Sequence, residues 1–113
     1  MLLRIVRGKL KPGSWIAFES AYQAAIADAG AVQGLCGRWL VQDVDDPDSG
    51  STISLWENEE ALRAYEKSDV LKQKITAKLM PFFSGQYETR TSRVRFATGE
   101  PAPSDWLGTG GDC

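Results

Sequence analysis

A dense turn sequence at the centre of the chain, DDPDSG over residues 45–50, restricts the fold more than any other feature. The residues before it, 34–44, are rich in strand formers, and those after it, 51–57, alternate in polarity. In this alternation Leu55 points to one side of a strand and Trp56 to the other. Turn residues between two such runs predict a β-hairpin. Neither of its faces is fully polar, so we expect both sides of the sheet to be covered.

Helical periodicity occupies the segments on either side of this hairpin. Apolar residues recurring at steps of three and four predict a helix over residues 14–29, with Ser14 as its N-cap. Gly30 is the expected C-terminal stop of that helix. A second helix is expected to begin at the N-cap Asn58 and, after a break in its middle, to reach about Met80.

Strands at both ends complete the pattern, over residues 2–11 and 85–96. The order β-α-β-β-α-β, with a hairpin and two strand–helix crossovers, predicts an α+β, ferredoxin-like fold. Its sheet is expected to be antiparallel, with helices on one face. This domain covers residues 1–96, and residues 97–113 form a Gly/Pro-rich C-terminal tail.

One face of such a sheet has no helices to cover it. Trp39, Leu40 and Val41 make that face partly apolar. A second copy of the sheet is the simplest cover, so we expect a homodimer formed through the sheet face.

Composition narrows the class of protein. With 113 residues, 42% hydrophobic and 25% charged, the chain can bury a core without metals. A net charge of −2 without a basic stripe argues against nucleic acid as a partner. No apolar run reaches membrane-spanning length, and the start MLLRIVRGKLK is too short and too charged for a signal peptide. We therefore expect a cytoplasmic protein that does not bind a membrane.

The chain contains no histidine, which removes the commonest general base and the commonest metal ligand. It has no C-x-x-C spacing, no phosphate-binding loop and no dinucleotide fingerprint. The acidic turn lacks the Gly and the distal Glu of a calcium loop. Any catalysis is therefore expected to proceed without imidazole, without a metal and without a cofactor.

The stretch from residue 34 to residue 69 resembles the central region of the antibiotic biosynthesis monooxygenase (ABM) family. That family combines a Gly-rich approach to a strand, an acidic turn, a strand ending in W-E-x-x-E-A-L and a helix ending near Ser. The matching residues here are Asp43, Asp45, Asp46, Pro47, Trp56, Glu57, Glu60, Ala61, Leu62 and Ser68. With Lys11-Pro12-Gly13 ahead of the first helix, the resemblance covers residues 2–96.

The resemblance implies a dimeric α/β barrel in which two ferredoxin-like sheets face each other, with a cavity between sheet and helices in each subunit. Members of the family include cofactor-free oxygenases that act on polycyclic phenols, and haem-degrading enzymes. The haem-ligating His has no counterpart here, so haem cleavage is not expected. In the phenol oxygenases a Trp in the place of Trp56 lines the substrate cavity.

Four residues are the candidates for substrate binding: Trp56, Tyr65, Trp39 and Arg4. Each also has a purely structural interpretation. Trp56 either walls a pocket or fills the core, and Tyr65 either contacts a phenol or is a buried tyrosine. Trp39 is also expected in core or dimer packing, and Arg4 at solvent or an interface.

Two functions of different classes remain open at this point. The first is a cofactor-independent monooxygenase that takes a small phenol or quinol and dioxygen. The second is a non-catalytic dimer of the same fold that binds a small ligand or acts as a stress-associated module. The resemblance favours the first, and the absence of an acid/base pair favours the second.

Overall fold

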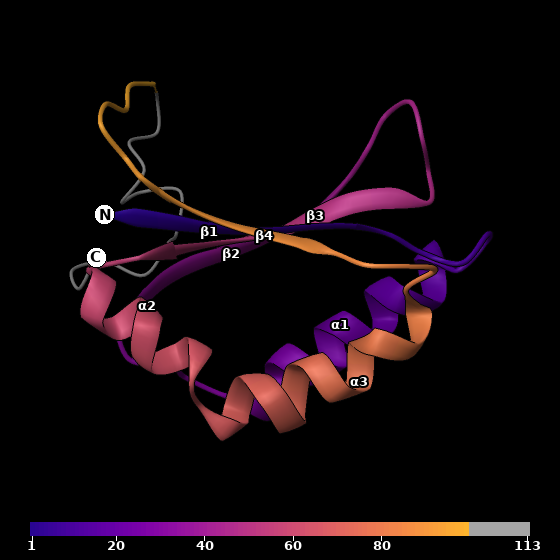
Figure 1. Cartoon of the computed structure of the whole chain (residues 1–113), viewed down its shortest axis with the longest axis horizontal. Helices are drawn as coiled ribbons and strands as arrows, with labels where there is room; N and C mark the ends of the chain where they lie inside the picture. The colour runs from indigo at the N-terminus through magenta and orange to yellow at the C-terminus, as the bar shows by residue number, and fades with distance from the viewer. Residues whose placement is uncertain (100–113) are drawn as a thin grey trace.

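The computed structural model describes residues 1–99, so the expected tail over residues 97–113 lies almost entirely outside the described residues (Figure 1). The elements are β1 (Leu2–Lys9), α1 (Trp15–Ala29), β2 (Leu35–Gln42), β3 (Ser49–Trp56), α2 (Glu59–Glu66), η1 (Val70–Thr76), α3 (Ala77–Leu79), η2 (Met80–Phe82) and β4 (Glu88–Arg93). The predicted β-α-β-β-α-β order is confirmed. The second helical segment is divided, because η1 is a π-helix and η2 a 3₁₀-helix.

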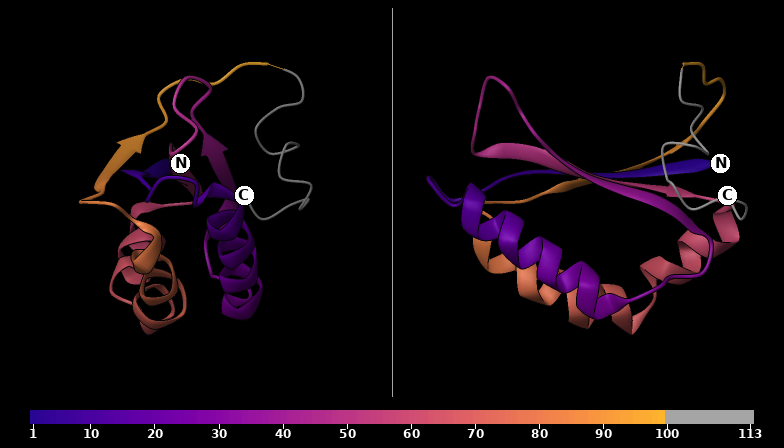
Figure 2. Two further views of the ribbon diagram at one scale, coloured as in Figure 1. Left: turned by 90° about the vertical axis from the view of Figure 1, so that its right-hand side faces the viewer. Right: turned by 180° about the vertical axis from the view of Figure 1, so that it is seen from behind.

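The four strands form one antiparallel sheet in the order β2-β3-β1-β4. All helices lie against one face of this sheet, which gives two layers (Figure 2). The predicted α+β, ferredoxin-like fold is therefore confirmed. Within one chain the sheet is open, and the barrel implied by the family resemblance requires a second copy.

Two of the three helix-end residues predicted from the sequence, Asn58 and Gly30, act as predicted, and Ser14 does not. Asn58 caps α2 as predicted, because its side chain accepts a hydrogen bond of 2.9 Å from the backbone N–H of Ala61. Gly30 ends α1 with a φ of 71°, a conformation that suits glycine. The predicted cap Ser14 is wrong in detail, because its side chain makes no capping bond. Its backbone carbonyl accepts from the N–H of Phe18 instead.

The core lies between the sheet and the helices. Phe18 of α1 is its centre, with ring centroids 5.8 Å from both Phe82 and Phe83. Gly8 of β1 permits this approach, since a Cβ there would lie 2.8 Å from the Phe83 ring. Burial of these rings fixes the distance between the two layers.

The other face of the sheet carries no helix of the described chain. Because side chains alternate along a strand, this open face carries Ile5, Trp39 and Ile53 at its centre. An ion pair between Arg7 and Asp43, with Nη1 and Oδ1 2.9 Å apart, lies at its edge. No helix in residues 1–99 has the length and apolar character that crossing a membrane would demand.

Candidate functional site

A cavity of about 80 Å³ lies between the sheet and the helices. Its apolar wall comes largely from α1, η1 and α3, and includes Phe18, Ile26, Leu71, Ile75 and Leu79. Its polar side chains include Arg4, Tyr22, Arg38, Ser54 and Tyr65, and Thr52, Thr76 and Tyr87 also line it. An apolar pocket with a few converging polar groups is the usual form of a small-molecule site.

Strand register brings two arginines to this cavity. Ser54 of β3 is the register partner of Arg4 in β1 and also of Arg38 in β2. All three side chains therefore lie in one row across three neighbouring strands, on the face that the helices cover. The sequence separates Arg4 and Arg38 by a helix, and only sheet pairing makes them neighbours.

Tyr65, in the last turn of α2, lies above this row. The guanidinium carbons of Arg4 and Arg38 are 5.9 Å and 5.8 Å from the centroid of its ring. These are cation–π distances. Arg38 Nη2 also lies 3.5 Å from the hydroxyl of Tyr65, to which it donates a long hydrogen bond.

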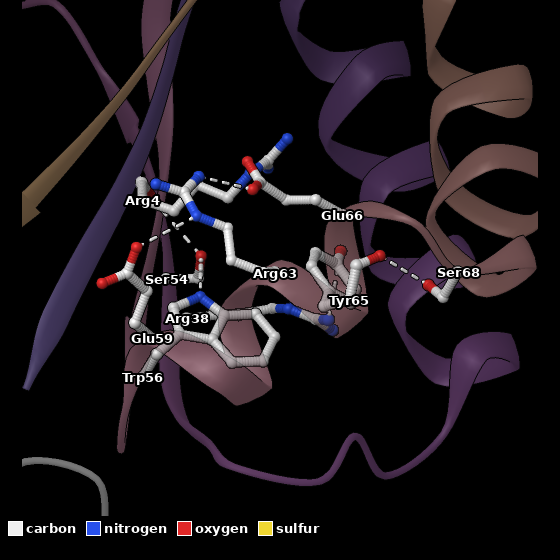
Figure 3. A network of polar contacts seen from close by, with 9 residues as sticks. All are labelled: Arg4, Arg38, Ser54, Trp56, Glu59, Arg63, Tyr65, Glu66 and Ser68. Atoms are coloured by element: carbon white, nitrogen blue, oxygen red, sulfur yellow. Dashed lines mark hydrogen bonds and ion pairs between the residues drawn. The ribbon is translucent and has the colours of Figure 1, made fainter.

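Arg4 has a carboxylate partner. Its Nε donates to Glu66 Oε2 over 3.2 Å, and the two side chains are 14% and 24% exposed. Glu66 also accepts a bond of 2.8 Å from Arg63 (Figure 3). Burial alone would raise the pKa of Glu66, but the hydrogen bonds from Arg63 and Arg4 outweigh it and lower that pKa. Glu66 is therefore a carboxylate at neutral pH and is the counter-ion that Arg4 shares with Arg63.

Tyr22 of α1 presents a hydroxyl to the same cavity and makes no hydrogen bond within residues 1–99. Its pKa is raised by burial and by Tyr65, and Arg38 opposes this rise. The hydroxyl therefore keeps its proton at neutral pH and can donate a hydrogen bond to a ligand.

Trp56 lies behind the cavity wall rather than on it. Its side chain is fully buried and does not line either of the two larger hollows in the described chain. Its indole N–H donates a 2.8 Å bond to the hydroxyl of Ser54, and its ring centroid is 4.8 Å from that of Tyr65 (Figure 3). Both neighbours line the cavity, so Trp56 supports two of its residues.

The structure thus brings together two of the four residues that the sequence suggested. Arg4 and Tyr65 line the cavity, Trp56 backs it, and Trp39 lies on the opposite, open face of the sheet. Sequence reasoning missed Arg38 and Tyr22. The alternation around Trp39 could have indicated Arg38, whereas Tyr22 is indistinguishable from the other apolar positions of α1.

A larger hollow of about 450 Å³ lies outside the cavity, between residues 31–34 and α2. Glu57 and Glu60 lie on it, with the apolar residues Val32, Ala61 and Val70. Tyr65 is the one residue shared by its lining and that of the cavity in residues 1–99. Tyr65 therefore contributes to the wall of both spaces.

In the described part of the chain, no three His, Cys, Asp or Glu residues come together in a group that could hold a metal ion. The groups available for chemistry at the cavity are therefore guanidinium, phenol and hydroxyl groups. They can bind and orient an oxygen-bearing ligand by hydrogen bonds and charge.

Solved structures share this fold. SnoaB, a cofactor-independent oxygenase from Streptomyces nogalater solved as a variant, aligns with a TM-score of 0.73 at 20% identity, over 88% of this chain and 97% of its own. A conserved protein from Methanosarcina mazei aligns with a TM-score of 0.70 at 20% identity, over 82% and 92% of the two chains. Rv0793 from Mycobacterium tuberculosis gives 0.70 at 14% identity, over 87% and 98%.

No curated protein is a significant match to the sequence. The family model described as antibiotic biosynthesis monooxygenase matches residues 1–76, which is more than half of the chain. That match includes β1 to η1, and therefore most of the polar residues that line the cavity, among them Arg4, Tyr22, Arg38, Ser54 and Tyr65. The chain belongs to the antibiotic biosynthesis monooxygenase family.

Proposed function

We propose that this protein is a cofactor-independent monooxygenase that acts on a small phenol or quinol. The substrate binds in the cavity between sheet and helices, with its ring against the apolar wall and its oxygen toward Arg4, Arg38, Tyr22 and Tyr65. The observation that carries the proposal is this convergence of two guanidinium groups and the Tyr22 and Tyr65 hydroxyls on a cavity with a largely apolar wall. Membership of the family supports it.

The substrate supplies every electron that the reaction needs. A phenolate passes one electron to dioxygen, and the resulting radical pair combines to form a C–O bond at a ring carbon. Protonation of the peroxide and loss of water leave a carbonyl at that carbon. One oxygen atom is retained and the other leaves as water, so a phenol and dioxygen give a quinone and water. No external reductant enters this balance.

The protein's contribution is orientation, exclusion of water and stabilisation of the anion. Arg4 and Tyr65 are proposed to lie beside the substrate oxygen, together with Arg38 and Tyr22. Trp56 acts as a positioning residue, because it holds Ser54 by a hydrogen bond and Tyr65 by ring packing. Trp39 is assigned no contact with substrate.

We also propose that the working protein is a cytoplasmic homodimer joined through the open sheet face. Ile5, Trp39 and Ile53 are partly exposed there and would be buried by a second copy. Val41 on this face is 40% exposed, so Val41→Glu should leave the subunit folded and dissociate the dimer. Sedimentation equilibrium tests this, and a monomeric unsubstituted protein would contradict it.

Dioxygen consumption tests the enzymatic function. The metal-free protein is mixed with a panel of one-ring phenols and quinols, and uptake is followed by an oxygen electrode. Incorporation of one labelled atom from ¹⁸O₂ into the product distinguishes oxygenation from simple oxidation. Tyr65→Phe should lower kcat/KM by about a hundredfold, whereas Trp39→Phe on the open face should not.

Absence of uptake across the panel would contradict the monooxygenase. If the same ligands still raised the melting temperature, the observations would support the non-catalytic ligand-binding dimer. That second function is favoured by one observation: no carboxylate lines the cavity in the described chain to act as a base.

A further inference from the structure

We propose that the cavity selects a singly charged aromatic anion, the phenolate of a one-ring phenol, and that Arg38 is the residue that binds its oxygen. This inference rests on the proposed substrate site and adds to it the charge and the size of the substrate. It also identifies how a phenol is ionised in a site without a histidine.

The charges around the cavity do not balance. Arg4 is paired with Glu66, a carboxylate that Arg63 shares, and Arg63 is also paired with Glu59, which Arg93 shares. Arg38 pairs with no carboxylate in residues 1–99, and no Asp or Glu of that range lines the cavity. Of the two arginines that line the cavity in residues 1–99, Arg4 therefore has a carboxylate partner and Arg38 has none.

Arg38 also has spare hydrogen-bonding capacity. A guanidinium has five N–H donors, and the side chain of Arg38 makes one hydrogen bond in the described chain, a 3.5 Å contact with Tyr65. Tyr22 offers a second donor that has no partner within residues 1–99. Two unsatisfied donors on one cavity define a place for an oxygen that accepts from both.

The free charge determines which form of a ligand binds best. A neutral phenol leaves the Arg38 guanidinium without a counter-ion in a partly desolvated space, whereas a phenolate neutralises it. A doubly charged ligand would bring a negative charge that no further free cation on the cavity offsets. The site therefore favours a charge of −1.

The size of the cavity restricts the ligand as well. Its volume of about 80 Å³ is far below the roughly 300–1,000 Å³ of ordinary ligand sites. It accommodates at most a single ring next to the polar row. Fused-ring phenols would have to displace Tyr65 to enter.

Binding of this anion requires no general base. The O–H bond of the phenol breaks in solution or at the cavity mouth, the proton goes to solvent, and Arg38 keeps all of its own protons. The guanidinium lowers the pKa of the bound phenol because it stabilises the charged form. Arg38 thus supplies through charge what an imidazole base would supply through proton transfer.

The test uses 4-nitrophenol, because its phenolate absorbs visible light and its neutral form does not. The absorbance of the ligand is titrated with pH, free and in the presence of excess protein. The bound ligand should titrate about one to three pH units below the free ligand. Nitrobenzene, the neutral analogue, and 4-nitrophenyl phosphate, a dianion, should both bind more weakly than 4-nitrophenolate.

Three variants locate the effect. Arg38→Met should abolish the shift in titration and weaken 4-nitrophenolate binding about tenfold or more, and Arg38→Lys should keep part of both. Arg90→Met removes the same charge from edge strand β4, outside the cavity lining, and should change neither. Circular dichroism verifies the fold of each variant.

Two results would overturn the inference: an unshifted titration in the unsubstituted protein, or equal binding of nitrobenzene and 4-nitrophenolate. Neither measurement needs turnover, so they separate this inference from the proposed function. Anion selection without dioxygen uptake would leave the inference standing and contradict the monooxygenase. Dioxygen uptake with unselective binding would support the monooxygenase and contradict the inference about the anion.

Discussion

The indole N–H of Trp56 donates a 2.8 Å hydrogen bond to the hydroxyl of Ser54, two residues earlier on the same face of β3. That hydroxyl lies 3.5 Å from the carbonyl oxygen of Arg4 in β1, to which it donates. Trp56 is thus connected to the row of residues that lines the cavity, although its own ring is fully buried. Its indole ring lies where β3 leads into α2 and packs there against Tyr65 of that helix.

Trp56→Phe should lower the free energy of unfolding. The change removes the hydrogen bond and leaves part of the indole volume empty, for a total of about 1–3 kcal/mol. Urea unfolding measures it. Combined with Ser54→Ala in a double-mutant cycle, the two changes should be less than additive. Strict additivity would show that the hydrogen bond contributes nothing.

Glu66→Gln should strengthen anion binding. Loss of the carboxylate frees Arg4, so a second cation faces the cavity, and 4-nitrophenolate should bind about two- to tenfold more tightly. Calorimetric titration measures the affinity. Glu60→Gln is the control, because Glu60 lies on the outer hollow and makes no ion pair in the described chain. Weaker binding to Glu66→Gln would contradict the neutralisation of Arg4 by Glu66.

Gly34→Ala should be more destabilising than Gly13→Ala. Both glycines have positive φ, 80° and 74°, which costs an alanine about 1–2 kcal/mol. At Gly34 the added Cβ would also lie 2.3 Å from Cβ of Ala61, while at Gly13 nothing lies within 4 Å. The contact with Ala61 should add about 1–3 kcal/mol. Equal losses of stability in the two variants, in thermal or urea unfolding, would show that Gly34, just before β2, does not pack this closely against Ala61 of α2.

Asp46→Asn should weaken the fold in a pH-dependent way. Hydrogen bonds from the Ser49 hydroxyl, the Asp48 backbone N–H and Lys9 lower the pKa of Asp46 below its ordinary value of 3.8. A lowered folded pKa contributes stability that is fully present above pH 3.8 and is lost as pH falls through the folded value. The variant should therefore be less stable at neutral pH, and the difference should disappear in acid.

Acid titration followed by circular dichroism measures this difference. Asp45→Asn is its matched control, since Asp45 makes no hydrogen bond or ion pair within residues 1–99. If the stability difference between Asp46→Asn and the unsubstituted protein persisted at the lowest pH, the charge of Asp46 would not be its cause. The altered hydrogen bonding of the amide side chain would then be responsible.

Tyr65→Ala should widen the range of ligands. Tyr65 lines both the inner cavity and the outer hollow, so truncation should join the two spaces and admit the two-ring phenol 2-naphthol. The loss of a buried ring should cost about 3–5 kcal/mol of stability. Tyr65→Phe keeps the barrier and serves as control. Equal binding of 2-naphthol by the unsubstituted protein would show that Tyr65 does not limit ligand size.

Local sequence signals predicted the features that depend on neighbours along the chain. Turn residues 45–50 produced the hairpin, and Asn58 formed its cap because the acceptor and the N–H lie three residues apart. Ser14 was predicted from the same rule and failed. Its backbone is in the α-helical region, with φ −93° and ψ −1°, whereas a capping residue such as Asn58 is extended and can turn its side chain toward the free N–H groups.

The sequence by itself determined the order of elements and the two-layer fold, because these follow from periods of two and 3.6 residues. It was wrong to group Leu40 with Trp39 and Val41 on the uncovered face, because the strand register places Leu40 against the core. Only the tertiary structure decided which side chains meet. Arg4 and Arg38 became neighbours through their shared partner Ser54, and Glu66 reached one of them and not the other. Tertiary packing also placed Trp56 behind the cavity, where it contacts Ser54 and Tyr65 instead of lining the cavity itself. Periodicity assigns a residue to a face, but strand register and helix placement select its contacts, and these depend on the packing of the whole domain.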